Sequence, residues 1–120
     1  MRIEDVHQQR VILKALGDEI SCQILSLISK NSESVLTIVE KTKIPSSSAY
    51  RRIKELEEMG LISVKHTIYT PQGKIVKIYK SVFREITIKF KDEEIVIEAI
   101  PNNDIVEKVG SFFGAFKRSE

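Results

Sequence analysis

The pattern of apolar residues changes once along this chain, near Leu61, and that change limits the folds the chain can adopt. Before it, apolar residues recur three or four positions apart, which is the spacing of one helix face. After it, apolar and polar residues alternate, as they do in a strand with one buried face. A chain of 120 residues with helices followed by strands predicts an α+β fold of one domain, or one domain with a short extension.

The composition narrows the class of protein further. Apolar residues make up 42% of the chain, which is enough to fill one core, and the formal net charge is only +2. No apolar run approaches the roughly 18 residues of a membrane span, and the first ten residues lack the apolar segment of a signal peptide. We therefore expect a cytoplasmic protein without membrane contact. One cysteine, Cys22, and two histidines predict neither a disulfide nor a metal site, and no motif predicts a cofactor.

Two helices are expected in the first thirty residues. Residues 5–16 form the first, with Gly17 placed to end it. Asp18 is then a suitable N-cap for the second, because its carboxylate can accept from free N–H groups of the first turn. The apolar positions proposed to face the core are Val6, Leu13 and Leu16 in the first helix and Ile20, Ile24, Leu27 and Ile28 in the second.

A third and a fourth helix follow. Thr37 is placed to cap the third, with Glu40 three positions on in the spacing of a capping box. Pro45 then interrupts the helical pattern. The fourth helix is expected from Ser46 to Met59, and Gly60 ends it.

The rest of the chain predicts two hairpins and a last helix. Strands at 62–68 and 75–79 flank a turn at Pro71, Gln72 and Gly73. Strands at 86–90 and 95–100 flank a second turn at Asp92, Glu93 and Glu94. The last helix begins near Pro101, and its apolar positions are Ile105, Val109, Phe112, Phe113 and Phe116.

The segment from Leu36 to Ile62 carries the functional signal. Two helices joined by a short break and followed at once by a hairpin have the order of a helix-turn-helix with a wing. In the fourth helix, Ala49, Ile53 and Leu56 share a narrow arc that predicts the buried face. The side chains on or beside the opposite face are Ser47, Tyr50, Arg51 and Lys54, with Arg52 nearer the core as a flank or phosphate contact.

Charge is concentrated in the same part of the chain. Residues 37–80 hold nine basic and four acidic side chains, a net charge of +5, so the remaining residues carry −3. No acid occurs between Ser63 and Lys80, a stretch that includes Lys65, Lys74 and Lys77. An acid-free helix start and a basic hairpin are typical of contact with double-stranded DNA, with the helix (about 46–59) in the major groove and the wing (about 62–80) on the flank.

Two stretches resemble a known family. LGDEISCQIL (residues 16–25) and IPSSSAYRRIKELEEMGLI (residues 44–62) resemble the second helix and the recognition helix of ArsR-like winged-helix regulators, and the IPxSxxYR pattern is similar to TrmB-like and other archaeal regulators. The resemblance implies a prokaryotic transcriptional regulator and DNA contacts at Ser46, Ser47, Ser48, Tyr50 and Arg51. The recognition helix lacks the cysteine pair of ArsR metal sensors, so the resemblance does not extend to thiolate metal sensing.

Two other functions are compared with DNA binding, and one of them stays open. A winged helix can also be a protein–protein interaction module of a transcription complex. An enzyme is not expected, because the sequence offers no nucleophile with a base partner and no phosphate loop.

The sequence also predicts a homodimer. Residues 1–81 are expected to form the DNA-binding domain and residues 82–120 a dimerisation extension. The apolar stripe of the last helix needs cover, which a second copy could supply, and the first helix could contribute to the same interface.

Overall fold

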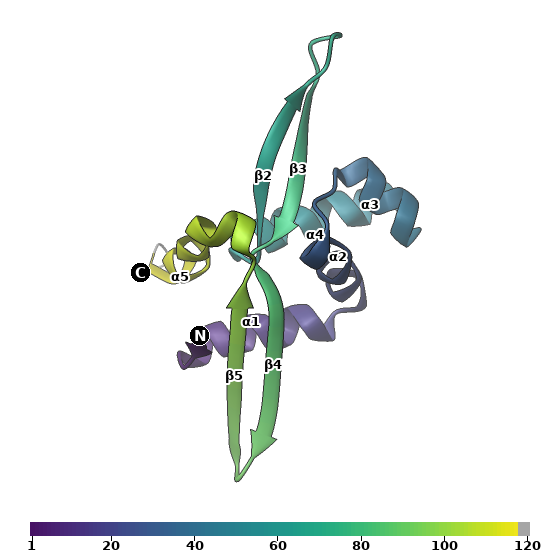
Figure 1. Ribbon diagram of the computed structural model, residues 1–120. Helices are drawn as coiled ribbons and strands as arrows, with labels where there is room; N and C mark the ends of the chain where they lie inside the picture. The colour runs from purple at the N-terminus through teal and green to yellow at the C-terminus, as the bar shows by residue number, and fades with distance from the viewer. Residues whose placement is uncertain (118–120) are drawn as a thin grey trace.

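The structure is a computed structural model that describes residues 1–117, with side chains described as far as Gly114. The elements run in the order β1 (Arg2–Ile3), α1 (Val6–Gly17), α2 (Glu19–Lys30), α3 (Val35–Thr42), α4 (Ser46–Glu58), β2 (Ile62–Tyr69), β3 (Ile75–Ser81), β4 (Phe83–Lys91), β5 (Glu94–Pro101), the 3-10 helix η1 (Asn103–Lys108) and α5 (Val109–Lys117). In Figure 1 the β2–β3 and β4–β5 hairpins project in opposite directions from a helical body. The predicted α+β winged helix-turn-helix with a C-terminal hairpin and helix is confirmed.

Side-chain caps begin the first three helices. Asp5, Asp18 and Ser34 each accept a hydrogen bond from the backbone N–H three residues on. The prediction that Asp18 caps the second helix is therefore confirmed. The predicted cap at Thr37 is wrong, because the Ser34 hydroxyl accepts from the Thr37 N–H and the helix starts earlier.

The buried face of α1 differs from the predicted one. Its buried residues are Gln8, Ile12 and Ala15, whereas Val6 is exposed and Leu13 and Leu16 are half-buried. Gly17 is the last residue of the helix and not a left-handed residue beyond it. The helix ends because Asp18 adopts an extended backbone, with φ −89° and ψ 120°, and the same residue caps the start of α2.

The strands form two small antiparallel sheets. One pairs β2 with β3, and the other has the order β1-β5-β4. The two-residue strand β1 has no counterpart in the prediction, since Arg2 and Ile3 are too few to show alternation. The β4–β5 hairpin turns through Asp92 and Glu93, which both have positive φ, as a tight two-residue hairpin turn requires.

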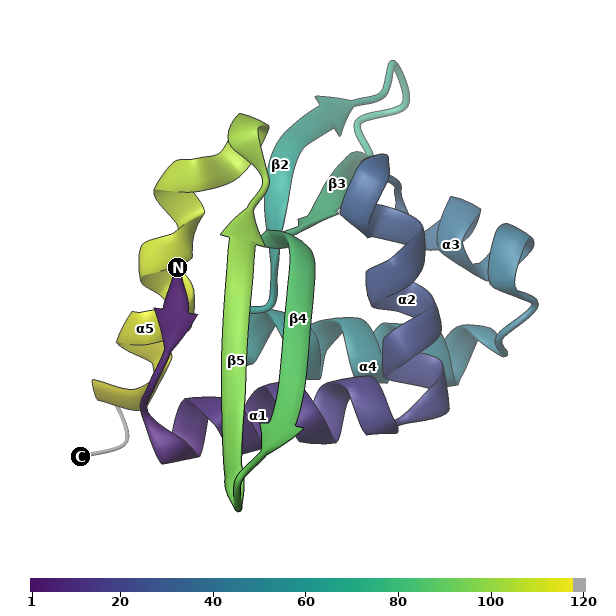
Figure 2. The ribbon, with the colours of Figure 1, turned by 60° about the horizontal axis from the view of Figure 1, so that its bottom comes forward.

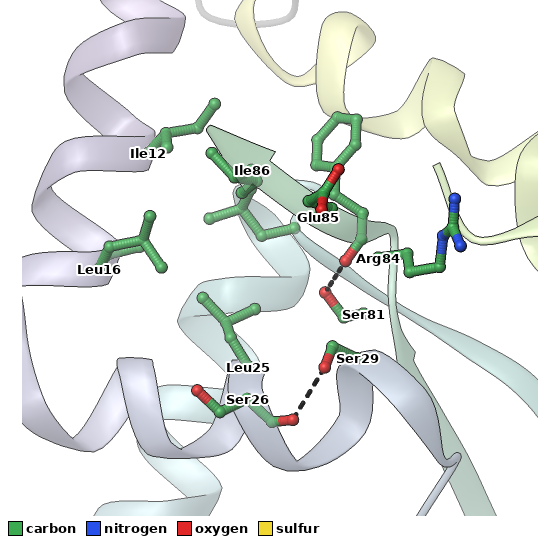
Figure 3. A pocket seen from close by; sticks show the side chains of 12 residues that line it. Ile12, Leu16, Leu25, Ser26, Ser29, Ser81, Arg84, Glu85 and Ile86 are labelled. Atoms are coloured by element: carbon green, nitrogen blue, oxygen red, sulfur yellow. Dashed lines mark hydrogen bonds between the residues drawn. The ribbon is translucent and has the colours of Figure 1, made fainter. Parts of the chain in front are cut away.

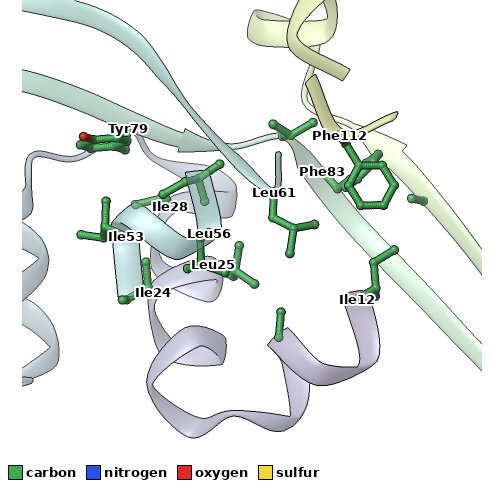
Figure 4. Packing of buried hydrophobic residues seen from close by; sticks show 14 of the residues in the cluster. Ile12, Ile24, Leu25, Ile28, Ile53, Leu56, Leu61, Tyr79, Phe83 and Phe112 are labelled. Carbon is green, nitrogen blue, oxygen red and sulfur yellow. The ribbon is translucent and has the colours of Figure 1, made fainter. Parts of the chain in front are cut away.

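One hydrophobic core joins the helices to the C-terminal segment. Figure 4 shows Phe112 of α5 and Phe83 of β4 lying beside Leu61 and Ile12. The Phe83 and Phe112 rings meet edge to face with centroids 5.4 Å apart. The predicted boundary between residues 81 and 82 falls between β3 and β4, and buried residues on both sides of it share this core.

The same packing removes residues from the predicted dimer contact. Ile105, Val109 and Phe112 are only 1%, 9% and 0% exposed, because the chain's own core covers them. They are therefore unavailable to a second copy. Phe113 is half-buried, and the side chain of Phe116 lies outside the described part.

The second hairpin gathers most of its apolar side chains on one face, whereas Val96 and Ile100 lie on the other face opposite Lys89 and Glu85. Cross-strand pairs place Ile86 opposite Ala99, Ile88 opposite Ile97 and Phe90 opposite Ile95. Figure 2 shows this hairpin crossing α1. Ile97 and Ala99 are fully buried, whereas Ile88 is 39% and Phe90 79% exposed. The face is therefore covered near the helices and open toward the turn.

Candidate nucleic-acid interface

The fourth helix buries the face that the sequence predicted. Ala49, Ile53 and Leu56 are 0%, 2% and 1% exposed and fix α4 against the core. The opposite side is exposed at Ser47, Arg51 and Lys54. This orientation follows from the helical period, because the three apolar positions fall within one narrow arc.

The outward residues of α4 are open to a ligand. Tyr50 is 61% exposed, and among the described residues neither Arg51 nor Lys54 forms an ion pair. Ser46 is exposed, and Ser48 is half-buried. No side chain caps the helix, because Pro45 occupies the N-cap position. The first N–H groups of α4 therefore lie beside exposed hydroxyls at the positive end of the helix.

The root of the wing lies beside one flank of α4. Burial raises the pKa of the Tyr79 phenol, and the neighbouring Glu57 and Tyr50 raise it further. Tyr79 of β3 thus lies close to two residues of α4 that are seven positions apart, on one side of the helix. Since side chains alternate along a strand, Lys77 lies on the same face of β3 as Tyr79.

The tip of the wing is exposed and partly apolar. Tyr69 and Ile75 are cross-strand partners and are 74% and 61% exposed. They lie on the same face as Lys77, because the intervening pair is Ile68 with Val76. Lys74 is exposed in the adjoining turn. Tyr69 is not among the residues predicted from the sequence, although an aromatic residue before a turn in a basic hairpin was a usable signal.

Arg52 is engaged within the protein. Its Nε lies 3.0 Å from an Asp18 oxygen, and its Nη1 lies 3.3 Å from a Glu55 oxygen. Hydrogen bonds from the Ser21 N–H and hydroxyl hold the pKa of Asp18 below its ordinary value, with Arg52 contributing. Arg52 therefore ties α4 to the start of α2.

Two of the wing lysines also have internal partners. The Lys65 ammonium lies 2.9 Å from an Asp104 oxygen in η1. Lys80 is buried, donates to the Lys30 carbonyl at the end of α2 (2.6 Å) and lies 3.5 Å from the same carboxylate. The hydrogen bond from Lys65 lowers the pKa of Asp104, and the charge of Lys80 adds to that effect. Sequence reasoning could not find these contacts, because Asp104 is far away along the chain.

A cavity of about 190 Å³ lies away from the exposed face of α4, between α1, α2 and the start of β4. Figure 3 shows apolar side chains such as Ile12, Leu16 and Leu25 on its walls. The Ser29 and Ser81 hydroxyls donate within the protein, to the Ser26 and Phe83 carbonyl oxygens. Within the described part of the chain, no three or more His, Cys, Asp and Glu side chains are grouped to hold a metal ion. No helix among the described residues is long and apolar enough to cross a bilayer.

Comparison with known proteins agrees with this geometry. No curated protein matches the chain. Residues 17–63 match the family model for winged helix-turn-helix DNA-binding domains. The matched stretch runs from the end of α1 to the first residues of β2 and includes α3 and α4. It supports a DNA-binding regulator, while the resemblance to ArsR-like and archaeal regulators stays a prediction.

Proposed function

We propose that this protein is a transcriptional regulator that binds double-stranded DNA sequence-specifically, with α4 in the major groove and the β2–β3 wing on the flank. One observation carries the proposal. The first two turns of α4 present an exposed stripe without acids, and the wing beside it adds exposed lysines. Major-groove helices of this class contact bases through their first turns, so the acids in the last turns of α4 stay clear of the phosphates.

The proposed contacts divide into two groups. Arg51 can bind guanine through both arms of its guanidinium, while Ser47 and Tyr50 offer hydrogen-bonding groups to neighbouring base edges. Phosphate contacts are assigned to Lys54, Lys74 and Lys77 and to the Ser46 and Ser48 hydroxyls at the uncapped helix start.

Arg52 and Lys65 take a different role in this proposal. Both were candidates for DNA contact, but their charged groups already bind carboxylates of the protein. We assign them to holding α4 and the wing in position. Residues 1–81 then carry the DNA contacts, and residues 82–120 complete the core and supply the contact between copies. Regulation would follow from occupancy of the site.

The test is a titration of the full chain against duplex DNA. Selection from random duplexes supplies a preferred site, and binding to that site and to an unrelated duplex is measured at several salt concentrations. The expected result is a preference for the selected site and an affinity that falls as salt rises. Failure to bind any duplex at low salt would overturn the proposal and leave the protein-interaction module as the surviving explanation.

A further inference from the structure

The outer edge of β4 is an unpaired strand edge. In the sheet order β1-β5-β4, β4 is the last strand over nine residues, and no strand of the described chain lies on its other side. Exposed edges of this length are rarely left bare, because their N–H and C=O groups can pair with another chain. Beside Glu85 and Ile86 the strand borders the cavity of Figure 3, whose other walls include residues of α1 and α2.

The hydrogen-bond pattern fixes which residues point outward. On the far side of β5, Ala99 and Met1 exchange backbone hydrogen bonds of 2.7 Å. Ala99 therefore does not bond to its cross-strand neighbour Ile86, and bonded and non-bonded pairs alternate along an antiparallel ladder. It follows that Ile86, Ile88 and Phe90 direct their N–H and C=O groups to the open edge.

The sequence of this edge is self-complementary. We propose that two copies of the chain pair antiparallel through β4, on a twofold axis at Ile88. This register places Ile86 opposite Phe90 of the second copy, on the face that already carries the apolar side chains. On the other face it places Glu85 opposite the second copy's Lys91, and Thr87 opposite its Lys89. Every outward N–H and C=O of the central residues gains a partner.

Neighbouring registers are less complementary. Moving the axis to Lys89 puts two Lys89 side chains directly opposite each other, which is unfavourable. Moving it to Thr87 puts Phe90 opposite Arg84. Of these three registers, only the axis at Ile88 matches both the charges and the apolar residues, and it also covers Phe90, which is 79% exposed in the single chain.

The sequence predicted a homodimer that forms through the last helix. In the dimer proposed from the structure, the two copies meet through β4 instead. This arrangement places the contact at the hairpin, which Figure 1 shows projecting away from the wing, so the proposed DNA surface stays free. The inference stands without DNA binding, because the oligomeric state is measured in the absence of DNA.

The first test is the oligomeric state by sedimentation equilibrium over a range of micromolar concentrations. The full chain is expected to be a dimer. Glu85→Lys should weaken it about tenfold, since two attractive pairs become repulsive, and adding Lys91→Glu should restore it. Glu107→Lys is the matched control, because this exposed acid of η1 lies outside the hairpin. A monomeric parent chain, or a dimer indifferent to Glu85→Lys, overturns the proposal.

The second test is a crosslink that reads the register. With Cys22→Ser as background, Ile88→Cys should form a disulfide-linked dimer on oxidation, since the two Ile88 residues face each other across the axis. Thr87→Cys should crosslink poorly with itself. Efficient linkage at Thr87→Cys and not at Ile88→Cys would contradict the register.

Discussion

In the proposed complex, recognition of the DNA bases depends on Arg51 more than on any other side chain. It lies opposite the buried arc of α4, and no carboxylate of the described chain neutralises it. We expect Arg51→Ala to weaken binding to the selected site by about 1–3 kcal/mol and to relax preference at one base position. Fluorescence anisotropy on the selected site and its single-base variants measures both effects. Binding equal to that of the parent chain would exclude Arg51 from base contact.

Asp18 is a single residue that stabilises the fold, because its carboxylate caps α2 and binds Arg52. Its pKa lies below the ordinary 3.8. A carboxyl with a lowered folded pKa stabilises the protein above its ordinary pKa, and this stability is lost as the pH falls through the lower value. Asp18→Asn should therefore lower the melting temperature at neutral pH.

The difference between Asp18→Asn and the parent should shrink below about pH 4. Thermal unfolding followed by circular dichroism at several pH values checks this. Asp92→Asn is the control, since asparagine suits the left-handed backbone of this turn position. A constant difference down to about pH 3 would contradict the assignment.

At the scale of the element, the wing contains two kinds of lysine. Lys74 and Lys77 are exposed, whereas Lys65 binds Asp104. Lys74→Ala and Lys77→Ala should weaken binding to specific and unrelated duplexes alike, and removing one phosphate contact should flatten the salt slope by about 0.9. Lys65→Ala should leave the slope unchanged. If Lys65→Ala flattens the slope as much as Lys74→Ala, the wing meets DNA with its other face.

At the scale of the whole molecule, Gly60 joins the two halves of the chain. Its φ is +77°, and a Cβ there would lie 2.4 Å from the Phe112 Cα. Gly60→Ala should therefore destabilise the protein by about 2–5 kcal/mol, from backbone strain and overpacking together.

The control for this change is Gly110→Ala, because a Cβ at that helical position meets nothing within 4 Å. That variant should be neutral or more stable. Chemical denaturation of both variants makes the comparison. Equal stability of Gly60→Ala and the parent chain would show that α5 does not lie against Gly60.

Local patterns predicted most of the helices and strands of this protein, though not β1, and the direction of α4. The spacing of Ala49, Ile53 and Leu56 predicted the buried face of the helix, and the exposed stripe follows from it. Alternation with turn residues predicted both hairpins. These features are local, because a helix or strand repeats within a few residues.

Only the tertiary structure decided which charges and apolar residues remain free. In the sequence, Lys65 and Lys80 cannot be distinguished from Lys74. In the structure both form ion pairs with the carboxylate of Asp104, which is far away along the chain. Likewise Phe112 is buried against Phe83, while Phe90, which has the same side chain, stays 79% exposed. Burial and ion pairing depend on contacts between segments far apart in the chain, and a periodic pattern carries no information about those contacts.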